Sequence, residues 1–144
     1  MDRGMNDGQW NKQWMEEEAM RSLRETDPEF TERLEHFILE EVEKEDGQQL
    51  EEPVRYLAVL SALIGCQGID LFREVLPFAI DGGLTPVEIK EIVYQSADYL
   101  GLGRMRPFLT AVNEVLESRG VAMPLPGQAT TTMEDRLEKG GQAQ

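Results

Sequence analysis

The sequence contains very little cysteine and histidine. Cys66 is the single cysteine and His36 the single histidine among 144 residues. One cysteine excludes an intrachain disulfide, and neither a Cys-x-x-Cys nor a His-Glu-x-x-His pattern is present. The sequence therefore predicts no resident metal ion and no other cofactor.

Long apolar runs are also missing. No run approaches the ~18 residues of a membrane-spanning helix, and the segment from Met1 to Trp14 is too polar for a secretory signal. We therefore expect a cytoplasmic protein that does not associate with membranes. The formal net charge is -14, which argues against binding to nucleic acid or to anionic lipid.

No segment of useful length alternates apolar and polar residues with the period of two that a strand requires. Apolar residues recur instead with helical spacing between Gly and Pro breaks. The sequence predicts an all-α domain over residues 9–120, with residues 1–8 disordered. Residues 121–144 form an extended tail, either disordered or an arm that wraps a neighbour. About six helices are expected, over residues 9–25, 27 to the charged loop at 45–49, 54–65, 71–81, 86–100 and about 104–118.

Several of the predicted helices have apolar faces that must pack against another element or another subunit. Trp10 and Trp14 share a helical face, which either the domain core or a partner subunit covers. The helix at 54–65 is apolar nearly all round, which is typical of the centre of a fold or of a subunit interface. The helix that begins at Asp27 carries an amphipathic stripe of Phe30, Leu34, Phe37, Ile38 and Val42.

The segment 79–103 is the most informative part of the chain. Gly82 and Gly83 stop one helix, and Thr85, Pro86 and Glu88 have the order of an N-cap, a first helical residue and a capping-box carboxylate. Two further glycines end the next helix. The sequence therefore predicts two helices here, joined by a short turn.

The order of these features resembles the carboxymuconolactone decarboxylase family, which shares the alkylhydroperoxidase D-like fold. Leu50 and Arg55 resemble the family's Leu-x-x-x-x-Arg pattern before the central helix. Gln95, Tyr99 and Gly101 match its Gln-x-x-x-Tyr-x-Gly pattern. The resemblance spans roughly residues 30–120 and implies an all-α, oligomeric protein: a dimer, trimer or hexamer. It indicates fold more strongly than activity.

The tail carries a second resemblance. Residues 124–144 are similar to the linker that joins two repeats in tandem members of the family, where a Lys-Gly-x-x-x-Gln pattern matches Lys139, Gly140 and Gln144. The chain then resembles the first repeat of a tandem protein. The other interpretation is that such tails are a common arm of single-repeat members.

The chain departs from the family at residues that carry chemistry. Decarboxylase-type members often have a histidine where this chain has Val75, and valine cannot transfer a proton. The peroxidase-type branch uses two cysteines, a histidine and a glutamate. Cys66 matches the first cysteine, whereas Ile69, Arg73 and Val54 replace the other three groups. A thiol–disulfide cycle needs a nearby resolving thiol, and this chain has none.

Five residues remain as candidates for a site. Glu74 and Cys66 are the catalytic candidates, while Arg55, Gln95 and Tyr99 are the candidates for binding a small acidic substrate. Structural interpretations stand beside these: a buried, inert thiol for Cys66, and hydrogen bonding in the core for Gln95 and Tyr99.

Two functions follow from the resemblance. The first is a carboxymuconolactone decarboxylase-like subunit, catalytically incomplete or partner-dependent, acting on a small acidic lactone. It would form a homo-oligomer or a hetero-oligomer with a second repeat. The alternative is a peroxide-handling oxidoreductase of the alkylhydroperoxidase D-like type that uses Cys66.

Overall fold

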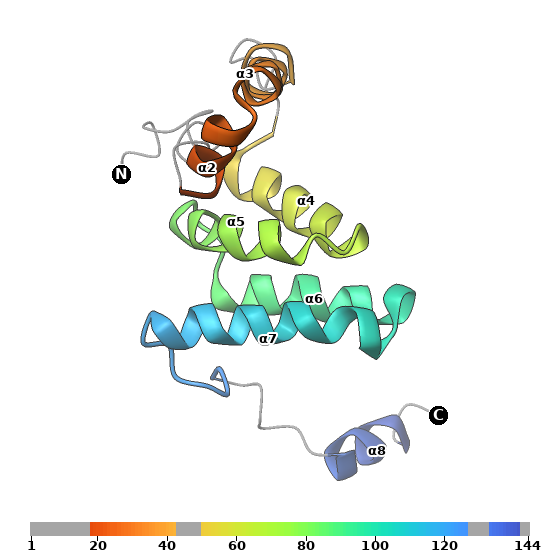
Figure 1. Cartoon of the computed structure of the whole chain (residues 1–144). Helices are drawn as coiled ribbons and strands as arrows, with labels where there is room; N and C mark the ends of the chain where they lie inside the picture. Colours follow the sequence, from red (N-terminus) through yellow and green to blue (C-terminus); the bar gives the residue numbers. More distant parts are fainter. Residues whose placement is uncertain (1–17, 43–49, 127–132, 142–144) are drawn as a thin grey trace.

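The computed structural model describes residues 18–42, 50–126 and 133–141 (Figure 1). These residues form helices and their connections, and no strand occurs among them, which confirms the predicted all-α class for this part of the chain. The elements are α2 (Glu18–Thr26), α3 (Pro28–His36), the π-helical η1 (Phe37–Val42), α4 (Glu52–Gly65), α5 (Ile69–Asp81), α6 (Pro86–Leu100), α7 (Leu102–Ser118) and α8 (Met133–Gly141).

Several sequence predictions lie outside the described residues. They are the disorder of residues 1–8, the tryptophan-bearing part of the first expected helix at 9–17 and the charged loop at 45–49. None of the described helices is both long and apolar enough to cross a membrane.

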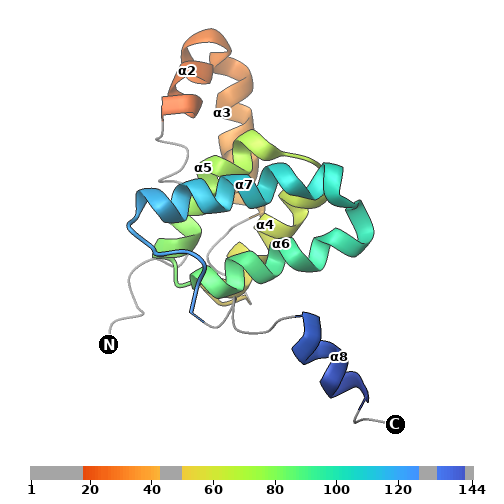
Figure 2. The same cartoon turned by 90° about the horizontal axis from the view of Figure 1, so that it is seen from below.

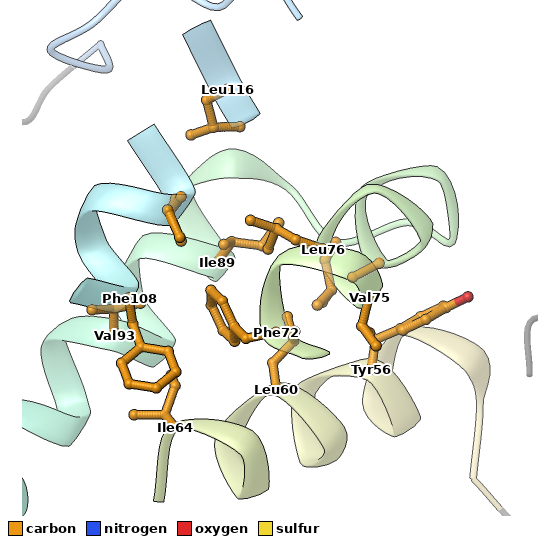
Figure 3. Packing of buried hydrophobic residues seen from close by; sticks show 14 of the residues in the cluster. Tyr56, Leu60, Ile64, Phe72, Val75, Leu76, Ile89, Val93, Phe108 and Leu116 are labelled. Carbon is orange, nitrogen blue, oxygen red and sulfur yellow. The ribbon is translucent and has the colours of Figure 1, made fainter. Parts of the chain in front are cut away.

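The main core lies between α4, α5, α6 and α7, where α4 packs on α5 and α6, and α7 packs on the same two helices. Phe72 of α5 and Phe108 of α7 meet edge to face, with ring centroids 5.0 Å apart. Figure 3 shows Leu60 and Ile64 of α4 pointing toward this aromatic pair. Because each helix presents one apolar stripe to the same centre, burial of these stripes stabilises the four helices together.

A smaller hydrophobic cluster joins α2, α3 and η1 to α5. Met20 is buried there against Leu34, Ile38 and Leu39, and against Leu71 and Phe78. Arg24 Nε also donates to Glu35 Oε1 at 2.6 Å, which ties α2 to α3. These elements lie on the α5 side of the body in both views (Figures 1 and 2).

The amphipathic stripe predicted for the helix that begins near Asp27 is covered only in part. Leu34 and Ile38 are half-buried, but Phe30, Phe37 and Val42 are exposed. The segment also changes from α-helix to π-helix at Phe37, so the expected single helix is two elements. The covered part of the stripe packs against Met20 of α2 and against Leu71 and Phe78 of α5.

The helix α4 is buried on one side only. Tyr56, Leu60 and Ile64 face the core, whereas Val54 and Leu57 are exposed. The expectation of a helix at the centre of the fold therefore holds for one face, and the other face is open to solvent in the single chain.

The turn between α5 and α6 matches its prediction closely. Glu88 N donates to Thr85 Oγ1 at 3.2 Å, and the Glu88 carboxylate accepts from Thr85 N at 3.3 Å, which completes the predicted capping box. Gly82 lies directly against the ring of Tyr56, and Gly83, with φ of 111°, lies against Pro53. The turn therefore packs on the first turns of α4.

Two helix starts differ from the sequence predictions. The helix expected over residues 71–81 begins at Ile69, with Gly68 as its N-cap and Asp70 in its first turn, and no side chain caps it. The α7 helix begins at Leu102, so it includes Gly103 and places Pro107 inside the helix. The carboxylate of Asp70 in the first turn of α5 is favourable through the helix dipole.

The start of the tail packs on the domain. Val121 and Met123 contact the main core, and Leu125 is buried. The α8 helix lies apart from the body in both views, with Met133 and Leu137 exposed (Figures 1 and 2). The tail therefore combines a packed beginning with a short helix whose Met133 and Leu137 are not covered by the described part of the chain.

Candidate functional site

The buried guanidinium group of Arg55 is the central feature of the candidate site. Arg55 lies in the first turns of α4, and its side chain is only 9% exposed. Its Nη2 donates to the carbonyl oxygen of Leu50 at 3.3 Å. Its Nη1 is buried and has no hydrogen-bond partner within the described part of the chain. A buried cation with an unused donor favours a negatively charged ligand.

Local sequence explains this geometry. Pro53 lies at the start of α4, where its missing N–H does no harm, and the Cα–Cβ bonds of a helix tilt toward its N-terminus. The guanidinium group of Arg55 therefore reaches back to Leu50, before the helix begins. This end of a helix carries a partial positive charge, which adds to the preference for an anion.

The turn between α5 and α6 limits the space around this helix start. A Cβ atom on Gly82 would lie 2.2 Å from Tyr56 Cε2, and one on Gly83 would lie 3.4 Å from Pro53 Cγ. The turn is therefore in direct contact with the two residues on either side of Val54 and Arg55. The first turns of α4 are held by this packing rather than by a side-chain cap, since Glu51 forms none.

Gln95 and Tyr99 lie on the exposed side of α6. Gln95 Nε2 is 3.5 Å from Glu91 Oε2, one helical turn away, and Tyr99 is 90% exposed. The interpretation that both residues form hydrogen bonds in the core is therefore wrong. Within the described residues, Arg55 is hydrogen-bonded to Leu50 and Gln95 to Glu91, so these two candidates have different partners.

Cys66 is exposed, so the interpretation of a buried thiol is wrong. It caps the C-terminus of α4, and its Sγ lies 3.6 Å from the carbonyl oxygen of Leu63. At the rise of a helix, eleven residues separate it from Arg55 by about 16 Å along the axis. Cys66 and Arg55 therefore lie at opposite ends of α4. Arg73, on α5, forms an ion pair with Glu114, so its charge is already matched by a carboxylate.

Glu74 and Val75 occupy neighbouring positions on α5 with different surroundings. Glu74 is half-buried, whereas Val75 is buried in the main core. Figure 3 shows Val75 beside Tyr56 and Leu76. Any side chain at position 75 is thus enclosed by apolar groups, while Glu74 retains access to solvent.

His36 and the acidic residues that the structure describes were compared with the requirements of a metal site. His36 is exposed, and its Nε2 lies 3.8 Å from Glu41 Oε1. Within residues 18–42, 50–126 and 133–141, no three His, Cys, Asp or Glu side chains are grouped so that they could hold an ion.

Two buried polar groups were not predicted from the sequence. Lys90 is buried on α6, and Asn113 Oδ1 is buried on α7 without a partner in the described residues. Lys90 directly follows the core residue Ile89, and Asn113 directly follows Val112. Their position beside apolar stripes is the one sequence signal that could have indicated burial.

Comparison of the chain with protein-family models, with curated proteins and with solved structures found no match. The resemblance to the carboxymuconolactone decarboxylase family therefore rests on the residue pattern alone.

Proposed function

We propose that this chain is a carboxymuconolactone decarboxylase-like subunit that binds a small carboxylic acid at Arg55 and needs a partner for catalysis. The supporting observation is the buried guanidinium group, whose Nη1 has no partner in the described residues. A ligand carboxylate would match the charge and accept this hydrogen bond. Such charge-assisted pairs are among the stronger polar interactions in proteins.

The dependence on a partner follows from what surrounds Arg55. A general acid or base must come within about 3 Å of the proton that it transfers. Val75 is apolar and buried, and Cys66 lies at the far end of α4. Glu74, on α5, is the remaining candidate in this chain, and a second repeat or subunit would supply the histidine that Val75 replaces.

The binding step makes the first testable prediction. Titration of the chain with γ-carboxymuconolactone, followed by calorimetry, should show saturable binding in the wild type. Arg55→Met should weaken it by about tenfold or more, because one charged hydrogen bond contributes about 1.5–3 kcal/mol. The chain alone should not turn the lactone over.

The matched control for this experiment is Arg33→Met. Arg33 is exposed and pairs with Glu29 at 2.5 Å, so its loss should leave binding unchanged. Because Nη1 is closed to solvent, a ligand reaches it only after a local opening at the start of α4. Equal binding by wild type and Arg55→Met would contradict the carboxylate site. Turnover by the isolated chain would contradict the need for a partner.

The peroxide-handling alternative is favoured by one observation, the exposure of Cys66. Ellman's reagent should titrate one thiol per native chain. Hydrogen peroxide consumption should nevertheless be the same for wild type and Cys66→Ala, because the chain holds no second cysteine that could resolve an oxidised thiol. A clear fall in peroxide consumption in Cys66→Ala would support the oxidoreductase and contradict the lyase-like proposal.

A further inference from the structure

The corner between α6 and α7 exposes two large side chains. Tyr99, in the last turn of α6, is 90% exposed, and Leu102, at the start of α7, is 68% exposed. Gly101 joins the two helices with φ of 76°, which brings the helix ends close together. Both views show this corner at one end of the helical body (Figures 1 and 2). The α6–α7 corner therefore presents one aromatic and one aliphatic side chain, Tyr99 and Leu102, to solvent.

Two unpaired arginines flank this corner. Arg104 and Arg106 are exposed and form no ion pair within the described residues, and Arg106 lies one turn from Leu102 on the same face of α7. They also lie in the first turns of a helix, where the dipole disfavours cations, and no acidic residue is present there. Four other arginines of the described chain, Arg24, Arg33, Arg73 and Arg119, each have a carboxylate partner.

The outer side of α3 and η1 exposes acidic residues in place of arginines, together with apolar side chains. Phe30, Phe37 and Val42 are exposed there, in a segment that also exposes Glu40 and Glu41. Glu40 has no ion-pair partner among the described residues, and Glu41 has only His36, at 3.8 Å. This acidic apolar face lies away from the α6–α7 corner in both views, so the two surfaces cannot meet within one chain (Figures 1 and 2).

We propose that the α6–α7 corner (Tyr99, Leu102, Arg104, Arg106) docks on the acidic apolar face (Phe30, Phe37, Glu40, Glu41) of a second copy of this chain. Each surface offers exposed apolar groups, and their charges are opposite. Within the described residues Arg104 and Arg106 have no carboxylate partner, and the acidic apolar face of another copy offers the two glutamates that can match them. The two surfaces differ, so the contact is heterologous and joins copies head to tail.

The small size of both surfaces sets the expected strength. A contact between two such surfaces buries less accessible surface area than a standard protein–protein interface. We therefore expect a dissociation constant of about 10–100 μM. Charge pairs at the rim are screened by salt. Association should therefore weaken several-fold between about 50 mM and about 500 mM sodium chloride.

Sedimentation velocity on the full chain tests this contact. The wild type should show concentration-dependent association at low salt. Arg104→Glu/Arg106→Glu should weaken it by about tenfold or more, and so should Glu40→Arg/Glu41→Arg, because each variant carries two surfaces of like charge. A mixture of the two variants should associate again, since every corner then finds a face of opposite charge.

The matched control is Glu117→Arg/Glu134→Arg, which changes the net charge as Glu40→Arg/Glu41→Arg does, at exposed residues outside both surfaces. It should associate like the wild type. A wild type that stays monomeric up to ~200 μM at low salt would overturn the proposal, as this is well above the expected dissociation constant. So would association that survives both charge reversals, or a mixture that fails to recover it. None of these results depends on ligand binding at Arg55.

Discussion

Replacing Phe72 by alanine should lower the free energy of unfolding by about 3–5 kcal/mol, the range typical of a deleted core aromatic. Phe72 is fully buried, and its ring packs edge to face on Phe108 with centroids 5.0 Å apart. It lies on α5, which packs against both α4 and α7. Removing the ring leaves a cavity that two neighbouring helices cannot fill without moving.

Urea denaturation followed by circular dichroism measures this loss. The matched control is Phe30→Ala, which removes the same atoms from a side chain that is 65% exposed. Its effect should stay below about 1 kcal/mol, because most of the ring is already in water. If both variants lost the same stability, the four helices α4–α7 would not form the core of the domain.

Replacing Gly82 by alanine should lower the free energy of unfolding by about 2–3 kcal/mol, as expected for overpacking at a buried contact. The added Cβ would lie 2.2 Å from Cε2 and 2.8 Å from Cδ2 of Tyr56. Tyr56 is itself buried, so its ring has little room to move away. Gly82 has φ of -78°, a conformation that alanine adopts freely, so the loss would come from the contacts of the added Cβ with the Tyr56 ring and with the carbonyl oxygen of Phe78, 3.0 Å away, and not from backbone strain.

The control for this substitution is Gly65→Ala, at the last residue of α4. Nothing lies within 4 Å of a Cβ there, and alanine favours a helix over glycine by about 0.5–1 kcal/mol. The same chemical change should therefore stabilise the protein at residue 65 and destabilise it at residue 82. Thermal melting should show a higher melting temperature than the wild type for Gly65→Ala and a lower one for Gly82→Ala. A neutral Gly82→Ala would mean that the turn does not pack on Tyr56.

Local sequence signals predicted α5, α6 and the turn between them well. The capping box of Thr85 and Glu88 needs only residues three apart, and the glycines before it need only a short turn. Along α5, Phe72, Val75, Leu76 and Ala79 recur with helical spacing and all four are buried. These features depend on chain neighbours, so the sequence alone contains the information for them.

Burial that depends on distant elements was less predictable. Phe30 and Phe37 repeat with helical spacing, yet they stay exposed because no described helix covers that side of α3 and η1. Cys66 follows an apolar helix and is nevertheless exposed, because α4 buries only one face. Periodicity shows that a face is apolar, but the partner that covers it is set by the tertiary arrangement.

The candidate site was likewise predictable only in its local features, and not in those that depend on the tertiary arrangement. Arg55 was predicted as a carboxylate ligand from its place after Leu50, and the structure adds that the two residues are joined by a hydrogen bond and that Nη1 is buried. Gln95 and Tyr99 were grouped with Arg55 by the family pattern, but they lie on the exposed side of α6. A pattern along the chain gives the order of residues and not the face on which each one lies.

The short connections between the core helices have a consequence for the folding rate. Three residues (66–68) join α4 to α5, four (82–85) join α5 to α6, and Gly101 alone joins α6 to α7. The most extensive core contacts, of α4 with α5 and α6 and of α7 with the same two helices, are therefore between helices that are first or second neighbours along the chain. Little loop entropy is lost before these contacts form, and domains of this kind fold within microseconds to milliseconds. The tight corners that shape the surface of this protein thus also make its assembly from the unfolded chain rapid.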